Sequence, residues 1–544
     1  MAKSTLVVMP TGTGKTVVFG HVTRDWPTGR IMILVHRDEL CSQAVASVGR
    51  ICSEQCGVEM AEESVHETSV FARPRVIVAS VQTLNSQRNG RYRMEKFDPR
   101  EFGLLVIDEA HHSTAPTYRR VIDWFRNVDL LGVTATPDRT DEEALGQIYG
   151  SVAFEYGILD AIGDGWLVTI EQQFVHVEGL DLSGCKSDKN DLQNVDVARV
   201  MNQEGLLHRV VDPIVQLAGD SPTLVFAASV EHAHKIAEIL NRHKSNSAVA
   251  IDGTTDKDFR REQLKSFTRG EFQYLVNMGV FLEGFDEPRI GCVAMARPTK
   301  SRALYAQCIG RGTRPLSGLV DGVDSAEMRK RLITDSGKPA LLVLDFVGNS
   351  GRHKLISTAD ILGGNESDEV IERATANAKR KSAQAGSGNQ AGKVDMQQEL
   401  AAAKDELEEE IRQRHDRERR AIASRKHIVA RAKFTTKAVN PFDIFDIVPK
   451  REPGWHKGRK ATQKQKDVLG RFKVDADTIA SLTFCQASEM LDLCIKRAKL
   501  GLCTVKQAKL LGRFGYSADS TFEEAGRIID SLARNKWQRP KEHV

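Results

Sequence analysis

The first candidate site is a glycine-rich stretch near the start of the chain, which reads PTGTGKT from Pro10 to Thr16. Its glycines let backbone N–H groups point inward at phosphate oxygens, and a helix expected after them adds partial positive charge. In this pattern Lys15 bridges the β- and γ-phosphates of ATP, and the Thr16 hydroxyl ligates Mg²⁺. The predicted nucleotide-binding residues are Pro10, Thr11, Gly12, Thr13, Gly14, Lys15 and Thr16.

Two adjacent carboxylates end an apolar stretch further along the chain, LLVIDEAHH. Neighbouring side chains of a strand diverge, so Asp108 and Glu109 suit two different tasks. We expect Asp108 to hold Mg²⁺ through water and Glu109 to orient and polarise an attacking water. The alternative is an acidic turn after a buried strand, which the upstream phosphate loop disfavours.

A pair of arginines lies in the stretch QCIGRGTR. Gln307, Arg311 and Arg314 fall on nearby turns of a predicted helix, so both arginines could face a cleft. Guanidinium groups stabilise charge on a transferring phosphoryl group. Alone, the stretch would be an ordinary basic surface turn. Together with the phosphate loop and the acidic pair, it predicts that Lys15, Glu109, Gln307, Arg311 and Arg314 are catalytic.

Short strands alternating with helices must position these groups. The runs TLVVMP, RIMILVH, RVIVAS, LLVIDEA and LLGVTAT form one series, and TLVFAAS, AVAIDG, YLVNMGV, CVAMARP and ALLVLDF form a second. Continuous apolar strands indicate a parallel sheet covered on both faces. The predicted fold class is α/β, with one domain at 1–160, a connector at 161–204 and a second domain at 205–365. The candidate residues follow strand ends, where open parallel sheets bind ligands.

The last third of the chain differs from the rest in composition and in hydrophobic pattern. We predict a flexible linker at 366–395, because this stretch is small, polar and without hydrophobic period, and one long charged helix at 396–434. That helix is as consistent with a solvated spacer as with a partner-binding coiled coil. A helical region at 435–544 contains two repeats, at about 461–497 and 503–537, because TQKQKDVLGRF returns as TVKQAKLLGRF.

Composition narrows the class of protein. A formal net charge of +4 is too small to imply a partner, so local basic stretches such as PKREPGWHKGRKATQKQK and RNKWQRPKEHV carry any nucleic-acid hypothesis. In them Trp455 or Trp537 could stack on a base, although packing within the repeats is favoured for Trp537. Nine cysteines without paired spacing indicate a reducing compartment, and Cys52 and Cys56 are interpreted as ordinary thiols. No signal or membrane-spanning segment is evident, which predicts a cytoplasmic protein without a membrane partner.

Seven motifs in order resemble superfamily-two DEAH-box helicases over roughly residues 1–355, close to the XPB-like and RadD-like bacterial or phage branch. They are PTGTGKT, LVHRDEL, ASVQTL, DEAH, TATP, GVFLEGFDEP and QCIGRGTR. The resemblance implies two RecA-like domains that close over ATP and reopen after hydrolysis, so that alternating grip moves a nucleic-acid strand.

The resemblance also implies roles for further residues. Residues that couple the nucleotide site to the neighbouring domain would be His111, Thr134 and Thr136. Contacts to the nucleic-acid backbone would come from Arg37, Thr83 and Ser229, and Gly284 and Asp286 would approach the nucleotide from the second domain.

Two departures from the family pattern stand out. Leu282 replaces a threonine that supports coupling or backbone grip, which predicts inefficient translocation. Related helicases also carry an upstream segment whose glutamine reads adenine, whereas STLVVMP opens directly on the central strand. We expect either a truncated start, which is favoured, or relaxed base recognition. The expected consequence is loss of discrimination between ATP and GTP.

The leading hypothesis is therefore an ATP-dependent DNA helicase or translocase acting in replication, repair or recombination. DNA is favoured over RNA by family analogy alone. The alternatives are an RNA helicase, a motor subunit of a restriction or defence complex, and a hydrolysis-impaired nucleic-acid-binding scaffold. A protein partner could bind the charged helix or the C-terminal repeats.

Overall fold

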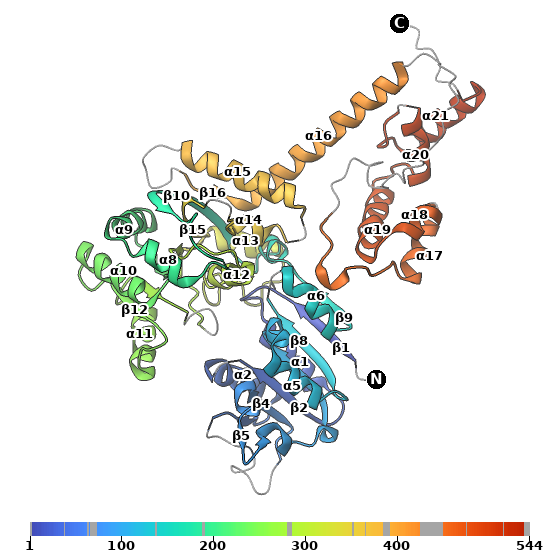
Figure 1. The fold of residues 1–544 in the computed structure, drawn as a ribbon. Helices are drawn as coiled ribbons and strands as arrows, with labels where there is room; N and C mark the ends of the chain where they lie inside the picture. The colour runs from blue at the N-terminus through green and yellow to red at the C-terminus, as the bar shows by residue number, and fades with distance from the viewer. Residues whose placement is uncertain are drawn as a thin grey trace. The chain divides into compact units, whose positions relative to one another are not determined.

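The computed structural model describes residues 3–36, 38–61, 65, 73–135, 139–187, 191–279, 285–350, 353–364, 366–384, 392–424, 450–474, 476–514 and 516–537. The chain forms two compact units (Figure 1). The first contains Met1–Gly364 and Ala374–Glu399, and the second contains Asn365–Arg373 and Leu400–Val544. Within the described residues, no helix is long and apolar enough to cross a membrane.

The first domain of the larger unit is built on a seven-stranded parallel sheet, drawn in blue tones in Figure 1. In spatial order its strands are β3 (Gly57–Glu59), β4 (Val76–Ser80), β2 (Arg30–Val35), β7 (Phe102–Asp108), β8 (Asp129–Thr134), β1 (Ser4–Val8) and β9 (Ser151–Glu155). The helices are α1 (Lys15–Asp25), α2 (Asp38–Cys52), α4 (Val81–Leu84), α5 (Pro116–Trp124), α6 (Arg139–Ile148) and α7 (Ile158–Gly163), with 3-10 turns η1 (Arg93–Lys96), η2 (Pro99–Glu101) and η3 (Ala110–Thr114) and a small hairpin β5 (Gln87–Arg88) to β6 (Arg91–Tyr92). Strand β4 is buried at every residue, as a strand covered on both faces requires.

The second domain repeats this design with another seven-stranded sheet. In spatial order its strands are β12 (Ala248–Ile251), β13 (Tyr274–Asn277), β11 (Thr223–Phe226), β14 (Cys292–Met295), β15 (Ala340–Asn349), β10 (Thr169–Asp181) and β16 (Val394–Asp395), and only β16 is antiparallel to its neighbour. The helices are α8 (Asn194–Met201), α9 (Glu204–Ala218), α10 (Val230–His243), α11 (Lys257–Arg269), α12 (Arg302–Gly310), α13 (Ala326–Thr334) and α14 (Thr358–Leu362). The predicted fold class, two parallel-sheet α/β domains in tandem, is confirmed.

The structure differs from two of the predicted boundaries. The expected connector at 161–204 contains β10, which pairs with β15 from Thr169 to His176 and so belongs to the second sheet. The expected linker at 366–395 contains helix α15 (Asp368–Gln384) and strand β16, which pairs with β10. The buried side chains of α15 are Val370 and Ile371 near its start, followed by Ala374 and Ala378. A polar, alanine-rich composition therefore concealed a helix that packs through two branched apolar residues and its alanines.

The long charged helix, α16, spans Met396–Ser424. The rest of the predicted range, to residue 434, lies outside the described residues. Leu400 and Leu407 are buried on this helix. Arg373 of α15 makes a bidentate ion pair with Glu410 of α16, with N–O distances of 2.8 and 2.9 Å.

The smaller unit ends in two helical repeats. The first contains α17 (Gln463–Arg471), α18 (Ala476–Ser481) and α19 (Phe484–Lys499), and the second contains α20 (Val505–Arg513) and α21 (Phe522–Arg534). In both repeats the two long helices begin with a threonine whose side chain caps the backbone, and the threonines are Thr462, Thr483, Thr504 and Thr521. Each repeat has a small apolar core of its own, around Leu469 in the first and Leu511 in the second.

Candidate active site

The glycine-rich loop connects β1 to α1 at the carboxyl end of the first sheet. Gly12 and Gly14 both have φ of +88°, a backbone conformation that glycine adopts without strain. The Thr13 hydroxyl donates to the Pro10 carbonyl at 2.8 Å and closes the turn. Helix α1 begins at Lys15, so its first N–H groups have no partner inside the helix. The loop is therefore a cradle of amides beside one lysine, which fits a phosphate.

The acidic pair lies on the neighbouring part of this sheet edge. Asp108 is the last residue of β7, and its Oδ1 accepts the Glu109 amide at 2.9 Å. Glu109 has a left-handed backbone, with φ of 52° and ψ of 53°, which is a strained conformation for a residue with a side chain. This turn brings its Oε1 to 3.5 Å from the Nζ of Lys15. Two residues 94 positions apart thus meet where the sequence motifs predicted a nucleotide site.

Electrostatics keep Glu109 ionised. Burial alone would raise the pKa of its carboxyl, but the Lys15 ammonium, followed by His111 and Arg311, holds that pKa well below its usual range. Its other oxygen, Oε2, is buried without a hydrogen bond and lies 3.4 Å from His111 Nδ1. In this state the Glu109 carboxylate is therefore charged and faces the Lys15 ammonium.

The second domain contributes the end of helix α12 to this site. A Cβ added to Gly12 would lie 2.7 Å from Arg314 Cγ, and one added to Gly310 would lie 3.0 Å from Thr11 Cβ. Arg314 therefore packs directly on the phosphate loop. Its guanidinium also forms an ion pair with Asp286, so two residues predicted to approach the nucleotide hold each other in place.

Arg311 and Gln307 occupy the same helix end. Arg311 Nη1 donates to the Phe285 carbonyl at 2.9 Å, and its charge reaches Glu109. Gln307 is buried, with 8% of its surface exposed. The structure thus gathers Lys15, Glu109, Arg311 and Arg314 around one loop, although they come from both domains.

One coupling contact is also present in the structure. His111 Nδ1 lies 3.1 Å from the Thr134 hydroxyl, which joins the acidic motif to the end of β8. Thr136, the other residue assigned to coupling, lies outside the described residues.

The sequence did not indicate a stack of rings that continues from His111. The His111 and His112 ring centroids are 4.1 Å apart, and His112 stacks on His36 at 4.3 Å. Gln82 Nε2 then lies 3.3 Å from His36 Nδ1. These ring contacts, tilted between His111 and His112 and stacked between His112 and His36, link the nucleotide site to the end of β2 and to helix α4 after β4. The only sequence signal was the pair of adjacent histidines in DEAHH, because the contact to His36 depends on strand order.

The structure describes two of the three residues that are predicted to contact the nucleic-acid backbone. The Thr83 hydroxyl accepts the Ala61 amide at 3.0 Å and is buried, and Ser229 Oγ caps α10 by accepting the His232 amide at 3.1 Å. Both hydroxyls therefore have structural partners, and their contact with nucleic acid stays a prediction. Arg37 lies outside the described residues, as do Gly284 and Leu282.

The groups that would hold a magnesium ion fit its chemistry. The Thr16 hydroxyl and the Asp108 carboxylate supply oxygen atoms, which Mg²⁺ prefers; Thr16 lies in the first turn of α1, and Asp108 ends β7 next to Glu109. In the described part of the chain, no group of three or more histidine, cysteine or acidic side chains could hold a metal ion. Cys52 and Cys56 are free thiols.

This fold and site are those of a phosphate-loop protein with two RecA-like domains. Residues 1–139 match the family described as the res subunit of type III restriction enzymes, and residues 206–315 match the helicase conserved C-terminal domain.

Three relatives share the same region. IRC3 of Saccharomyces cerevisiae, named as an ATP-dependent helicase, is 32% identical over 57% of this chain and 46% of its own length. The Schizosaccharomyces pombe irc3, named as a mitochondrial ATP-dependent helicase, is 30% identical over 67% of this chain and 57% of its own length.

The DNA 3′-5′ helicase XPB of Mycobacterium tuberculosis is 28% identical over 57% of this chain and 55% of its own length. These relatives and the two matched domain families are those of superfamily-two helicases, the family that the motifs of this chain resemble. It spans about half the length of the curated relatives that it matches.

Proposed function

We propose that this protein hydrolyses ATP with Mg²⁺ and uses the energy to move along or unwind DNA. The observation that carries the proposal is the meeting of Lys15 and Glu109 on the first domain with Arg311 and Arg314 of the second. A site divided between two domains can change their separation when its ligand binds and leaves. The helicase names of the relatives support the nucleic-acid substrate.

In this proposal the phosphates of ATP take the place of Glu109 beside Lys15. The freed carboxylate then accepts a hydrogen bond from water and orients it for attack on the γ-phosphate. Arg311 and Arg314 stabilise the charge that develops on the transferring group, which is worth about 10³ to 10⁵ in rate for comparable arginines. Held by Thr16 and Asp108, Mg²⁺ would neutralise phosphate charge. The contact between His111 and Thr134 would transmit the loss of the γ-phosphate to the end of β8.

The finer assignments belong to the same proposal. DNA is chosen over RNA, and a repair role over others, because one relative is named as a DNA helicase of the XPB type. The DEAH-box motif supports the DEAH-box subgroup. A cytoplasmic location is supported by the nine cysteines, all of which are free thiols. The charged helix and the repeats are the proposed sites for a protein partner.

A triplex-displacement assay tests movement directly. The protein would release a third strand from duplex DNA in the presence of ATP, and Lys15→Ala would abolish release while leaving DNA binding intact. Failure of the unaltered chain to release the strand, with ATP hydrolysis present, would contradict movement on DNA. The same assay on duplex RNA distinguishes the two substrates.

A second candidate is the motor subunit of a restriction assembly. It is favoured by the family match of residues 1–139, whose description is that of a restriction enzyme subunit. Co-purification with a nuclease, together with DNA cleavage that requires ATP, would support this candidate over a motor that acts alone.

A further inference from the structure

The two C-terminal repeats end their second helix in the same backbone pattern. Three successive amides turn back to the last helical turn in each repeat. The bonds are Leu500 to Lys496, Gly501 to Ala498 and Leu502 to Arg497 in the first repeat, and Asn535 to Ser531, Lys536 to Ala533 and Trp537 to Leu532 in the second. Gly501 and Lys536 both have positive φ; at the next position Trp537 also has a positive φ, of 60°, whereas Leu502 does not. By the hydrogen bonds Leu502 is the positional counterpart of Trp537, although the two backbone φ angles differ there.

The counterparts differ in what they cover. In the second repeat, the Trp537 ring stacks on Phe514, with centroids 6.1 Å apart and planes 27° apart. The counterpart of Phe514 in the repeated sequence is Phe472, since LGRF occurs in both copies. In the first repeat the smaller Leu502 replaces the indole. The second repeat therefore supplies its own aromatic ring where the first does not.

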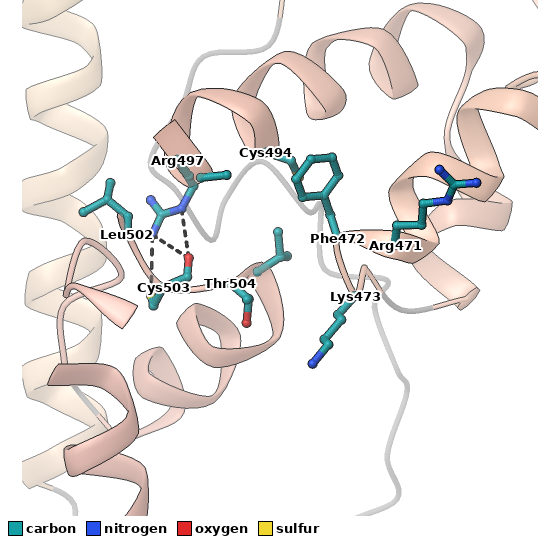
Figure 2. A pocket seen from close by; sticks show the side chains of 10 residues that line it. Arg471, Phe472, Lys473, Cys494, Arg497, Leu502, Cys503 and Thr504 are labelled. Carbon is teal, nitrogen blue, oxygen red and sulfur yellow. Dashed lines mark hydrogen bonds between the residues drawn. The ribbon is translucent and has the colours of Figure 1, made fainter. Parts of the chain in front are cut away.

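A cavity of about 120 Å³ lies at this place in the first repeat. Phe472, Cys494, Leu502 and Val505 form the apolar part of its lining. In Figure 2, Phe472 projects between the segment that carries Arg471 and Lys473 and the helix that carries Cys494. Arg497 is not available to a ligand, because it is buried and bound to Asp519 and to backbone carbonyls. The cavity can thus accept a flat apolar ring against Phe472.

The segment that supplies Arg471, Phe472 and Lys473 to the cavity is rich in positive charge. Residues 450–474 contain nine lysines and arginines and two acidic residues. Within the described residues, no carboxylate pairs with the exposed Lys464, Arg471 or Lys473. Arg471 and Lys473 directly flank Phe472 and extend in different directions in Figure 2. An apolar ring slot between unneutralised cations matches a base attached to a phosphate backbone.

We propose that this slot, defined by Phe472, Leu502, Arg471 and Lys473, binds one base of a single-stranded nucleic acid and its flanking phosphates. The base stacks on Phe472 at the place that Trp537 occupies in the second repeat. This inference rests on the proposed function in one respect, since it supplies that motor with a second grip on nucleic acid outside its ATPase domains. An aromatic side chain of a partner protein would fit the ring slot but would not use the adjacent cations.

The test uses the full chain without nucleotide and a fluorescent oligothymidine, with affinity measured by anisotropy. Leu502→Trp fills the slot with the ring that the second repeat already carries, and it weakens binding by about five-fold or more. Leu500→Trp is the matched control, because Leu500 is 63% exposed and does not line the cavity. The control variant binds the oligonucleotide as the unaltered chain does.

A charge variant checks the phosphate contact and leaves Phe472 and Leu502, which form the ring-binding part of the slot, in place. Lys473→Gln lowers the slope of log affinity against log salt by about 0.7, which is the effect of one lost phosphate contact on a single strand. Lys506→Gln, at an exposed position of the second repeat, leaves the slope unchanged. The unaltered chain and Leu502→Trp bind an abasic oligonucleotide with equal affinity, because no base remains to stack.

Equal oligothymidine affinity of Leu502→Trp and Leu500→Trp would overturn the inference, as would an unchanged salt slope in Lys473→Gln. Neither result bears on the proposed function, which is tested separately by measuring ATP hydrolysis stimulated by DNA. If the slot variants lose affinity while that stimulation is absent, the slot stands and the motor function fails.

Discussion

A buried carboxyl beside the arginine-bearing helix gives the most quantitative prediction. Asp345 on β15 is 8% exposed, and its Oδ2 accepts the Tyr305 hydroxyl at 2.8 Å as well as the Gln172 amide. Tyr305 belongs to α12, which ends at Gly310 just before Arg311. Burial raises the pKa of Asp345 to about 7, and the two hydrogen bonds only partly oppose this rise. Ionisation of Asp345 therefore opposes the packing that holds α12 on its sheet.

The sign of the effect follows from linkage. A carboxyl whose pKa is higher in the folded chain holds its proton more tightly there, so its stabilising contribution is complete below pH 3.8 and is lost as the pH rises through about 7. One pKa unit corresponds to about 1.4 kcal/mol, so the interval from 3.8 to about 7 corresponds to about 4 kcal/mol. About half of that loss, roughly 2 kcal/mol, develops between pH 5.5 and pH 8.5.

Asp345→Asn removes the ionisation and keeps an oxygen that can accept from Tyr305 and Gln172. Its amide can also donate to Gln172 Oε1, which is buried without a hydrogen bond. We expect the stability of the variant relative to the unaltered chain to increase by about 2 kcal/mol between pH 5.5 and pH 8.5. Urea unfolding of both proteins at the two pH values, followed by Tyr and Trp fluorescence, measures this difference. A difference that stays constant with pH would refute the assignment of a raised pKa to Asp345.

Three other substitutions have defined outcomes. Gly12→Ala forces a side chain into a left-handed conformation at about 1–2 kcal/mol and places its Cβ 2.7 Å from Arg314 Cγ, so ATP should no longer raise the melting temperature; retained stabilisation by ATP would contradict a close-fitting loop. Arg311→Ala should lower kcat about 10³-fold or more in single-turnover hydrolysis while ATP affinity changes little, and a kcat within ten-fold of normal would remove Arg311 from catalysis. Arg497→Ala removes a buried guanidinium that binds Asp519 and the Ala518 carbonyl, and it should destabilise the helical repeats by about 3 kcal/mol in urea, with ATP hydrolysis preserved.

The sequence predicted the sheets well because their strands are locally distinctive. The ten predicted strands are short apolar runs, and all but β12, which lies at an edge of the second sheet, occupy inner positions where burial on both faces removes polar alternation. Strand β10 was missed because its exposed and buried residues alternate, with buried Ile170 and Gln172 on either side of Glu171. That alternation is typical of a strand near a sheet edge, and the antiparallel partner β16 is only two residues long. Such a pairing cannot be recognised from local composition.

The candidate site likewise combines features that the sequence predicted with contacts that it did not. Gly12, Gly14 and Lys15 act through a local turn, so their spacing alone indicated a phosphate loop. The packing of Arg314 on Gly12 and the ring stack from His111 to His36 join residues far apart in the chain. Their contacts depend on strand order and on the fit of two domains, which no spacing encodes.

The central claim is tested most directly by steady-state hydrolysis of ATP by the purified chain, with and without single-stranded and duplex DNA, beside Glu109→Gln. Replacing the carboxylate by an amide keeps the size of the side chain but removes the charge that faces Lys15 at 3.5 Å. We predict hydrolysis that DNA stimulates in the unaltered chain and that Glu109→Gln abolishes, with ATP still bound. Hydrolysis that persists in Glu109→Gln, or an unaltered chain inactive with every DNA, would contradict the account.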